Sequence, residues 1–359
     1  MKSRYTTLFA ALVGCGTMSS VQAQFVPEFH FSGFGTLGVV KTNTDQANFG
    51  RDRQSYGGAN TNASADVDSN LGLQATADVA PWLSGTAQIL TVKRTTEKHL
   101  TVEPEWAFLK TSPMEGLSFR GGRLAVPMFL VSDSRNIGYA NNWLRAPNEV
   151  YGLVSFRRLQ GFDVTYQLPV GPTTLTLNAL TGTSETKYGT THFHMKGVKG
   201  INAQLETEWA TFRLGKVEAK YDTAAAQSYS FTGLGVTVDR NNIFVQAEVV
   251  QKRAPLVPSA EGDGDYIMAG YRFGKLLPYA SYASTKPKTN LGNGNTAGSQ
   301  STDAIGLRWD AFKTASLKFQ LERIDTKGTK GISFYNSAVK TVVVTSPVTA
   351  ISAAVDFVF

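Results

Sequence analysis

Residues 71–79 read Leu-Gly-Leu-Gln-Ala-Thr-Ala-Asp-Val, with an apolar side chain at every odd position and a polar side chain or glycine at every even one. Successive side chains of a β-strand point to opposite faces, so this period of two predicts a strand with one apolar and one polar face. The alternation recurs from residue 29 onward, clearly in 162–168, 201–209, 243–249 and 317–323. The sequence therefore predicts an all-β fold.

The alternating runs predict sixteen strands, at 28–41, 68–79, 82–94, 101–111, 116–126, 160–169, 172–183, 197–209, 210–222, 229–240, 242–253, 263–273, 275–286, 302–311, 314–326 and 346–359. Tight turns, among them 80–82, 170–172, 240–242 and 273–275, alternate with mostly long polar connections, among them 42–67, 127–159, 184–196, 287–301 and 327–345. An even strand count with this polarity of loop length is typical of outer-membrane barrels. We therefore predict a closed antiparallel 16-stranded transmembrane β-barrel, because closure leaves no strand edge unpaired in lipid.

The first residues have the composition of a secretory leader. Lys2 and Arg4 precede a short apolar core at 8–13, and Val-Gln-Ala at 21–23 is a small-residue cleavage site. This predicts a cleaved signal peptide at 1–23 and a barrel domain at 24–359. A rival interpretation is a lipoprotein-processing box, Leu-Val-Gly-Cys at 12–15. Cleavage after residue 23 removes the only cysteine, which excludes disulfide and thiol chemistry from the mature chain.

The charge content and its distribution indicate which classes of partner the chain can bind. Charged residues make up 18% of the chain, and the formal charge of +7 is spread along it, without a basic stripe interleaved with aromatic residues. We expect no nucleic-acid partner. No window approaches the ~18 consecutive apolar residues of a spanning helix, so the chain would cross a membrane only as strands.

Residues 127–150, PMFLVSDSRNIGYANNWLRAPNEV, form the longest well-populated break in the alternation. Proline brackets the stretch, and Gly138 with the Asn pair at 141–142 supplies turn chemistry. A loop this long that carries many apolar side chains must bury them. We therefore predict that it folds into the barrel after the fifth strand. A bulge at Gly121-Gly122 would place both Arg120 and Arg123 on the polar face of that strand.

Two regions carry a family resemblance. Ile351, Ala353, Val355, Phe357 and Phe359 occupy alternate positions, and this resembles the C-terminal strand of Gram-negative outer-membrane barrels. In that family the strand is read by the barrel assembly machinery, which implies that Phe359 is an assembly signal. The run Arg-Gly-Gly-Arg-Leu-Ala-Val-Pro at 120–127, followed by Ser-Asp-Ser-Arg at 132–135, Gly-Tyr at 138–139 and Pro-Asn-Glu-Val-Tyr at 147–151, is similar to the constriction-loop region of proteobacterial porin-like proteins. With its leader, sixteen strands and terminal Phe, the chain resembles Gram-negative general porins.

The porin resemblance implies an outer-membrane homotrimer in contact with lipid and lipopolysaccharide. It also implies passive diffusion of small hydrophilic solutes and ions through a water-filled channel, narrowed by the loop after the fifth strand. Within that loop the candidate constriction residues are Asp133, Arg135, Tyr139, Trp143, Arg145 and Glu149.

A candidate basic wall faces the loop and consists of Arg120, Arg123, Arg157 and Arg158. Asp133 and Glu149 opposite these arginines would create a transverse field that orients water and dipolar solutes. The basic wall favours anions. Because Glu103, Glu105, Glu206 and Glu208 also fall on polar faces, the sign of the selectivity stays open.

Two other functions remain in competition. One is a substrate-selective channel, for example for small anionic or organic acid solutes, with Tyr139, Trp143 and the arginines as its site. The other is an outer-membrane barrel enzyme, for which the sequence offers no convincing Ser/His/Asp set. The GxGxxG pattern at 33–38 continues as a strand, and His192 and His194 lack a third ligand nearby. We expect no enzyme activity, no cofactor and no metal site.

Overall fold

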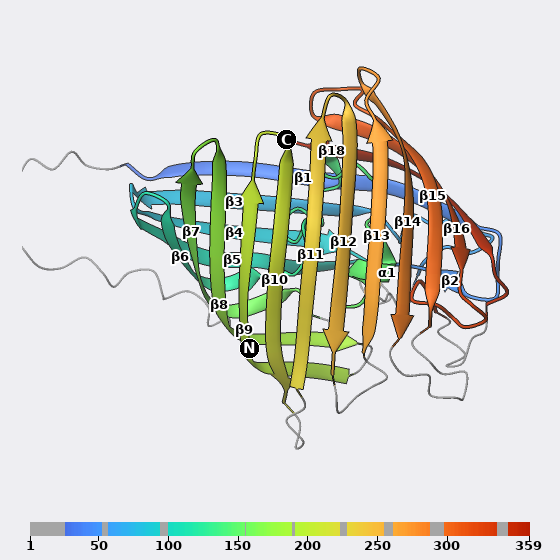
Figure 1. The fold of residues 1–359 in the computed structure, drawn as a ribbon, viewed down its shortest axis with the longest axis horizontal. Coiled ribbons are helices and arrows are strands. Elements are labelled where there is room, and N and C mark those ends of the chain that lie inside the picture. The colour runs from blue at the N-terminus through green and yellow to red at the C-terminus, as the bar shows by residue number, and fades with distance from the viewer. Residues whose placement is uncertain are drawn as a thin grey trace, which may run out of the picture.

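The computed structural model describes residues 26–51, 57–93, 100–154, 156–188, 191–222, 228–254, 261–287, 298–335 and 344–359. Sixteen antiparallel strands close into one barrel, and β1 pairs with β18 to complete the ring (Figure 1). The barrel strands are β1 (Glu28–Thr42), β3 (Asn70–Ala80), β4 (Leu83–Val92), β5 (Thr101–Met114), β6 (Leu117–Ala125), β7 (Arg158–Val170), β8 (Thr173–Tyr188), β9 (Thr191–Glu206), β10 (Ala210–Tyr221), β11 (Ser228–Arg240), β12 (Ile243–Arg253), β13 (Gly262–Tyr271), β14 (Leu276–Pro287), β15 (Gln300–Trp309), β16 (Ala315–Asp325) and β18 (Val348–Val358).

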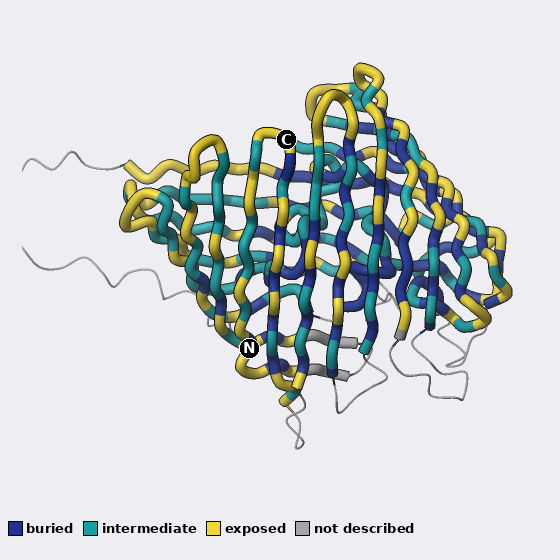
Figure 2. Tube along the Cα trace, viewed as in Figure 1, coloured by how far each residue is buried: buried dark blue, intermediate teal, exposed yellow. Residues whose placement is uncertain are grey.

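The predicted barrel and its strand count are confirmed. The predicted signal peptide, 1–23, lies outside the described residues. Exposed and buried positions alternate along the strands, as Figure 2 shows. On β12, Ile243 and Val249 are exposed outward, whereas Gln246, Glu248 and Lys252 are buried inward. The period of two in the sequence therefore corresponds to an apolar outer face and a largely polar inner face.

Residue types fix the tight turns. Asn241 and Asn242 both have positive φ, 52° and 67°, in the hairpin between β11 and β12. A two-residue turn with positive φ at both positions matches the right-handed twist of the flanking strands, and asparagine tolerates this conformation. Gly171 and Gly274 take the same left-handed region, with φ of 58° and 60°, in two other predicted turns.

Two local predictions were wrong. The predicted polar loop at 184–196 is mostly strand, because β8 and β9 extend into a hairpin that pairs up to Tyr188 and Thr191. Backbone pairing continues there although the apolar alternation has stopped. The predicted bulge at Gly121-Gly122 is also absent, since β6 stays in register with β7 from Leu117 to Ala125. Arg123 therefore shares the parity of exposed Phe119, not that of Arg120.

The first and last long connections fold together at one end of the barrel. β2 (Asn48–Phe49) and β17 (Phe334–Tyr335) form a separate two-stranded sheet, and the Phe49 and Phe334 rings lie 5.6 Å apart. A buried apolar cluster surrounds this sheet: Val40, Ala47, Phe49, Ala59, Val67, Ile324, Phe334, Val344, Val348 and Ala350. The parts of 42–67 and 327–345 that the structure describes are thus packed together.

Two short helical turns lie between β6 and β7: η1 (Gly138–Ala140) and α1 (Asn148–Tyr151). In the described parts of the chain, neither of these nor any other helix has the length and apolarity needed to cross a membrane.

Candidate pore and its inward segment

The connection between β6 and β7 lies against the inner wall of the barrel. Leu130 N donates to Glu248 Oε1 at 2.8 Å, and Lys252 Nζ donates to the Leu153 carbonyl at 3.0 Å. Arg213, an inward side chain of β10, donates to the Pro127 carbonyl. Because Glu248 and Lys252 are inward residues of β12, both ends of the connection are fixed to this wall. We call residues 126–154 together with 156 and 157 the inward segment.

Apolar side chains of the inward segment pack on the same wall. The Phe129 ring stacks on Tyr151 with centroids 4.4 Å apart, and Trp143 meets Tyr266 edge-on at 5.4 Å. These side chains belong to one large buried cluster, which also includes Met128, Val150, Leu153, Phe156, Phe231, Val250, Met268 and Leu277. Phe129 and Trp143 are thus buried inside the barrel, in line with the apolar content of the stretch.

The middle of the inward segment reaches the opposite wall. Lys318 Nζ, on β16, donates to the carbonyls of Gly138, Asn141 and Trp143 at 2.7, 2.6 and 2.9 Å. The same ammonium lies 2.8 Å from Asp356 on β18. A Cβ on Gly138 would lie only 2.0 Å from an Asp356 carboxylate oxygen, so the backbone approaches β18 closely. The segment therefore crosses the barrel interior.

Arg145 forms the most complete of these attachments. Its Nε and Nη2 donate to the two Asp68 oxygens at 2.8 and 2.6 Å, and Nη1 donates to Glu322 at 2.6 Å. Its guanidinium also lies 4.8 Å from the centroid of the Phe49 ring. Burial, which lowers the pKa of Arg145, is outweighed by the two carboxylates, so the pKa is raised overall. Arg145 thus joins the inward segment to β16 and to the connection between β2 and β3.

Glu149 attaches α1 to β15. Its Oε1 accepts a hydrogen bond from Gln300 Nε2 at 2.6 Å and another from the Thr302 hydroxyl. Burial raises the pKa of this carboxyl, and the two hydrogen bonds only partly offset that effect. The neighbouring Asn148 amide donates to the Gly50 carbonyl and the Ser333 hydroxyl, both at 2.9 Å. The inward segment is therefore also tied to the two packed end connections.

The inner wall is covered unequally. From β12 to β18 the inward side chains are buried, for example Gln246, Tyr266, Thr302, Lys318, Gln320 and Ser352. On β3 to β9 many polar inward side chains stay partly exposed, for example Gln74, Thr76, Thr86, Ser118, Thr165, Asn178, Asn202 and Gln204. The polar inward side chains of β3 to β9 are therefore less covered than those of β12 to β18.

The predicted constriction residues separate into two groups. Trp143, Arg145 and Glu149 are buried, with 5%, 5% and 2% of their surface exposed. Asp133 is exposed, and Arg135 and Tyr139 are partly exposed. The expectation that Glu149 faces a basic wall was wrong. Its carboxylate is instead enclosed by Gln300 and Thr302, which no pattern close to it in the sequence indicated.

Of the four predicted wall arginines, Arg120 and Arg123 lie on β6, Arg157 precedes β7 and Arg158 begins it. Arg120 and Arg158 each form an ion pair with a carboxylate of another strand. Arg120 Nε donates to Asp163 at 3.0 Å, and Arg158 Nη2 donates to Glu103 at 2.6 Å. Arg123 and Arg157 are partly exposed. Because two of the four are paired with carboxylates, the role of these arginines as a basic pore wall stays a prediction.

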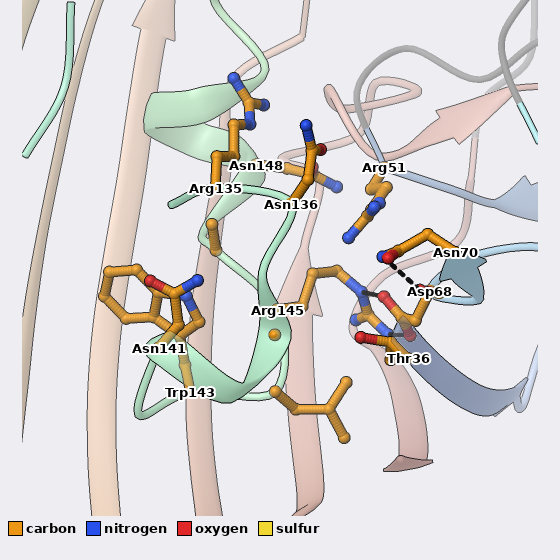
Figure 3. Close-up of a pocket in the computed structure, with 13 residues that line it drawn as sticks. Thr36, Arg51, Asp68, Asn70, Arg135, Asn136, Asn141, Trp143, Arg145 and Asn148 are labelled. Carbon is orange, nitrogen blue, oxygen red and sulfur yellow. Dashed lines mark hydrogen bonds and ion pairs between the residues drawn. The ribbon is translucent and has the colours of Figure 1, made fainter. Parts of the chain in front are cut away.

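A recess between the inward segment and the β1–β3 wall contains residues that sequence reasoning missed. Its lining includes Arg51, Asn70, Arg135 and Asn136 (Figure 3). In Figure 3, Arg135 and Asn136 lie on the inward segment, Arg51 and Asn70 lie across from them, and Arg145 reaches over to Asp68. Asn70 is an inward polar residue at the start of β3, and Arg51 follows β2. Only the folding of a long connection into the barrel end brings them to this recess.

Phe359, the predicted assembly signal, closes the barrel seam. Its N–H donates to the Gly33 carbonyl at 3.0 Å, and Gly33 N–H donates back to the Phe359 carbonyl at 2.8 Å. The signalling role itself stays a prediction.

No protein-family model and no curated protein matches the chain. Among solved structures, OmpF of Salmonella typhi in complex with daunomycin is similar at 14% identity and a TM-score of 0.64, over 92% of this chain and 97% of that one. An anion-selective porin from Comamonas acidovorans is similar at 12% identity and a TM-score of 0.57, over 93% and 100%. The trimer form of OmpT, an outer membrane protein of Vibrio cholerae, is similar at 11% identity and a TM-score of 0.56, over 93% and 100%. At these identities the likeness concerns the fold, a 16-stranded barrel shared with outer-membrane proteins.

Proposed function

We propose that the chain is an outer-membrane porin that forms a water-filled channel for passive diffusion of small hydrophilic solutes and ions. The observation that carries the proposal is the partly exposed polar inner face of β3 to β9 beside the inward segment. A 16-stranded barrel is too wide for its own inward side chains to fill, so water occupies the remainder. The inward segment narrows this space without closing it.

The outer face supports a membrane location. Large apolar side chains are exposed at alternate positions all around the barrel, including Leu73, Leu109, Phe162, Ile201, Leu214, Leu234, Val249, Ile267, Ile305, Phe319 and Ile351. Such an extensive apolar surface is stable in lipid and not in water. The similar structures include porins and a trimer form, which favours an outer-membrane homotrimer exported by its signal peptide. A channel of this kind carries out no turnover.

Liposome swelling tests the proposal. Purified protein would be reconstituted into vesicles, and the swelling rate measured in isotonic neutral sugars of increasing size. A porin predicts rapid swelling with the smallest sugar and a steep decline with size, since the inward segment restricts the pore. Vesicles without protein and vesicles with heat-unfolded protein are the controls. A correctly folded barrel that gives no swelling with any sugar would contradict the proposal.

A further inference from the structure

A tryptophan ring lies on the inner wall of the barrel, beside uncharged polar side chains. We propose that Trp106, together with Thr86 and Gln74, forms a subsite for neutral sugars in their ring form. The inference rests on the proposed channel function, because a sugar reaches this wall only through the lumen. It adds to that function a preferred class of solute.

A bulge in β5 turns Trp106 inward. The pairing of β4 with β5 shifts by one residue here, since Gln88 lies opposite Trp106 and Ile89 lies opposite Pro104. Ile89 is exposed on the outer face, whereas Gln88 is buried on the inner face. Glu105, the extra residue, also points inward, and its Oε1 accepts a hydrogen bond from the inward segment at 3.2 Å. The bulge thus places two consecutive side chains on the inner face.

The Trp106 ring is partly exposed. Because the side chain points inward, the exposed part of the ring faces the barrel interior. The ring centroids of Trp106 and Phe108, the next inward residue, lie 6.5 Å apart. Phe108 packs against the large buried cluster, and the Arg120 guanidinium lies 5.4 Å from its ring centroid. Trp106 belongs to none of the buried clusters formed by the described residues, so a solute can reach its ring.

The polar side chains next to the ring on β3 and β4 are uncharged. Gln88, directly across from Trp106, donates from Nε2 to Oε1 of Gln74 at 2.9 Å. This bond uses the oxygen of the Gln74 amide, so its nitrogen is the group that can donate to a solute. One step further along the ladder, the hydroxyls of Thr76 and Thr86 lie 3.1 Å apart. Gln74, Thr76 and Thr86 are all partly exposed on the inner face.

These groups fit a solute with apolar faces and a polar rim. A pyranose sugar carries C–H groups on its two faces and hydroxyls around its edge, so it can stack on an indole while its hydroxyls meet the polar side chains alongside. Thr86 is a diagonal neighbour of Trp106 across the β4–β5 ladder, and such neighbours lie about 7–8 Å apart. One sugar ring can therefore contact both. An open-chain polyol carries similar hydroxyls but has no flat apolar face.

The test compares glucose with sorbitol, its open-chain counterpart. The full mature protein is placed in planar lipid bilayers, and the potassium chloride current is recorded while each solute is added. Glucose should reduce the current saturably, whereas sorbitol should reduce it only in proportion to the conductivity of the bulk solution. The half-blocking glucose concentration should be the same in low and in high salt, because uncharged groups bind the sugar. Equal effects of the two solutes, or a glucose block that weakens with salt, would overturn the subsite.

Variants separate stacking from hydrogen bonding. Trp106→Ala should raise the half-blocking glucose concentration about tenfold, and Trp106→Phe should restore part of the block. Thr86→Val should raise that concentration about fivefold, as expected from one net hydrogen bond. Phe119→Ala, on the outer face of β6, is the control and should leave it unchanged. A normal glucose block in Trp106→Ala, in a barrel with the conductance of the wild type, would also overturn the subsite.

The failure of the subsite differs from the failure of the channel. A barrel that conducts potassium chloride but does not distinguish glucose from sorbitol keeps its porin function and lacks the subsite. A folded barrel without any current, seen before a sugar is added, would remove the proposed function and the subsite together.

Discussion

Glycines on the first strands of the barrel make room for aromatic rings. A Cβ on Gly72 would lie 2.2 Å from Cζ of Phe34, and one on Gly33 would lie 2.3 Å from Cζ of Phe359. The two rings differ in freedom. Phe34 is buried in a cluster with Leu90 and Val92, whereas Phe359 ends the chain and is 65% exposed. The same substitution should therefore have different costs at the two glycines.

Gly72→Ala should destabilise the barrel by about 1–3 kcal/mol, because the Phe34 ring can move only by disturbing its cluster. Gly33→Ala should cost less, since the terminal ring can turn outward. Thermal unfolding in detergent, followed by circular dichroism, measures both. Equal losses of Tm, or a larger loss for Gly33→Ala, would show that the buried ring is not the determining contact.

Arg145→Met removes the buried cation and leaves Asp68 and Glu322 unpaired in the barrel interior. Such a loss typically costs about 3–5 kcal/mol. The control is Arg253→Met, because Arg253 pairs with Asp263 at 2.6 Å near the surface, with both side chains partly exposed. That pair should contribute only about 0–1 kcal/mol. Thermal unfolding in detergent, followed by circular dichroism, compares the two variants. A Tm for Arg145→Met as high as that for Arg253→Met would contradict a stabilising role for the ion pairs of Arg145 with Asp68 and Glu322.

At the scale of elements, the inward segment is hydrogen-bonded to the inner wall of the barrel and packed against it. Its apolar content predicted that it would be buried, and Phe129 and Trp143 are buried as expected. The burial of Arg145 was not predictable, because its partners lie 77 and 177 residues away in the sequence. Charged residues in a loop normally indicate contact with solvent, and only the closed barrel brings these partners together.

The contribution of Glu149, which anchors α1, to the stability of the fold depends on pH. Burial holds its pKa in the folded state above the ordinary value of 4.5. The folded state therefore binds the proton more tightly than the unfolded state. The contribution of Glu149 to stability is complete below about pH 4.5 and is lost as the pH rises through the raised pKa of the folded state.

Glu149→Gln removes this titration and keeps an oxygen that can accept from Gln300 and Thr302. In thermal unfolding over a range of pH, the variant should gain Tm relative to the wild type as the pH rises above 4.5. Glu206→Gln, an exposed change near the end of β9, is the control and should leave the pH profile close to that of the wild type. A constant difference between Glu149→Gln and the wild type at every pH would contradict the raised pKa.

At the scale of the whole molecule, the alternation of residue types predicted the architecture almost completely. The predicted 28–41 and 229–240 correspond to Glu28–Thr42 and Ser228–Arg240. The prediction failed where the alternation of residue types stops, in the extended hairpin of β8 and β9 and in the packed end connections. The alternation also could not show which part of the inner wall the inward segment covers, because β12 to β18 and β3 to β9 have similar polar inner faces.

The central claim is that an aqueous path remains beside the inward segment. Single-channel recording in planar lipid bilayers tests it most directly. The account predicts stepwise current increments with a linear current–voltage relation for the folded protein in simple salt. A protein that circular dichroism shows to be folded as β-structure, and that inserts into the bilayer without producing any current step, would contradict it.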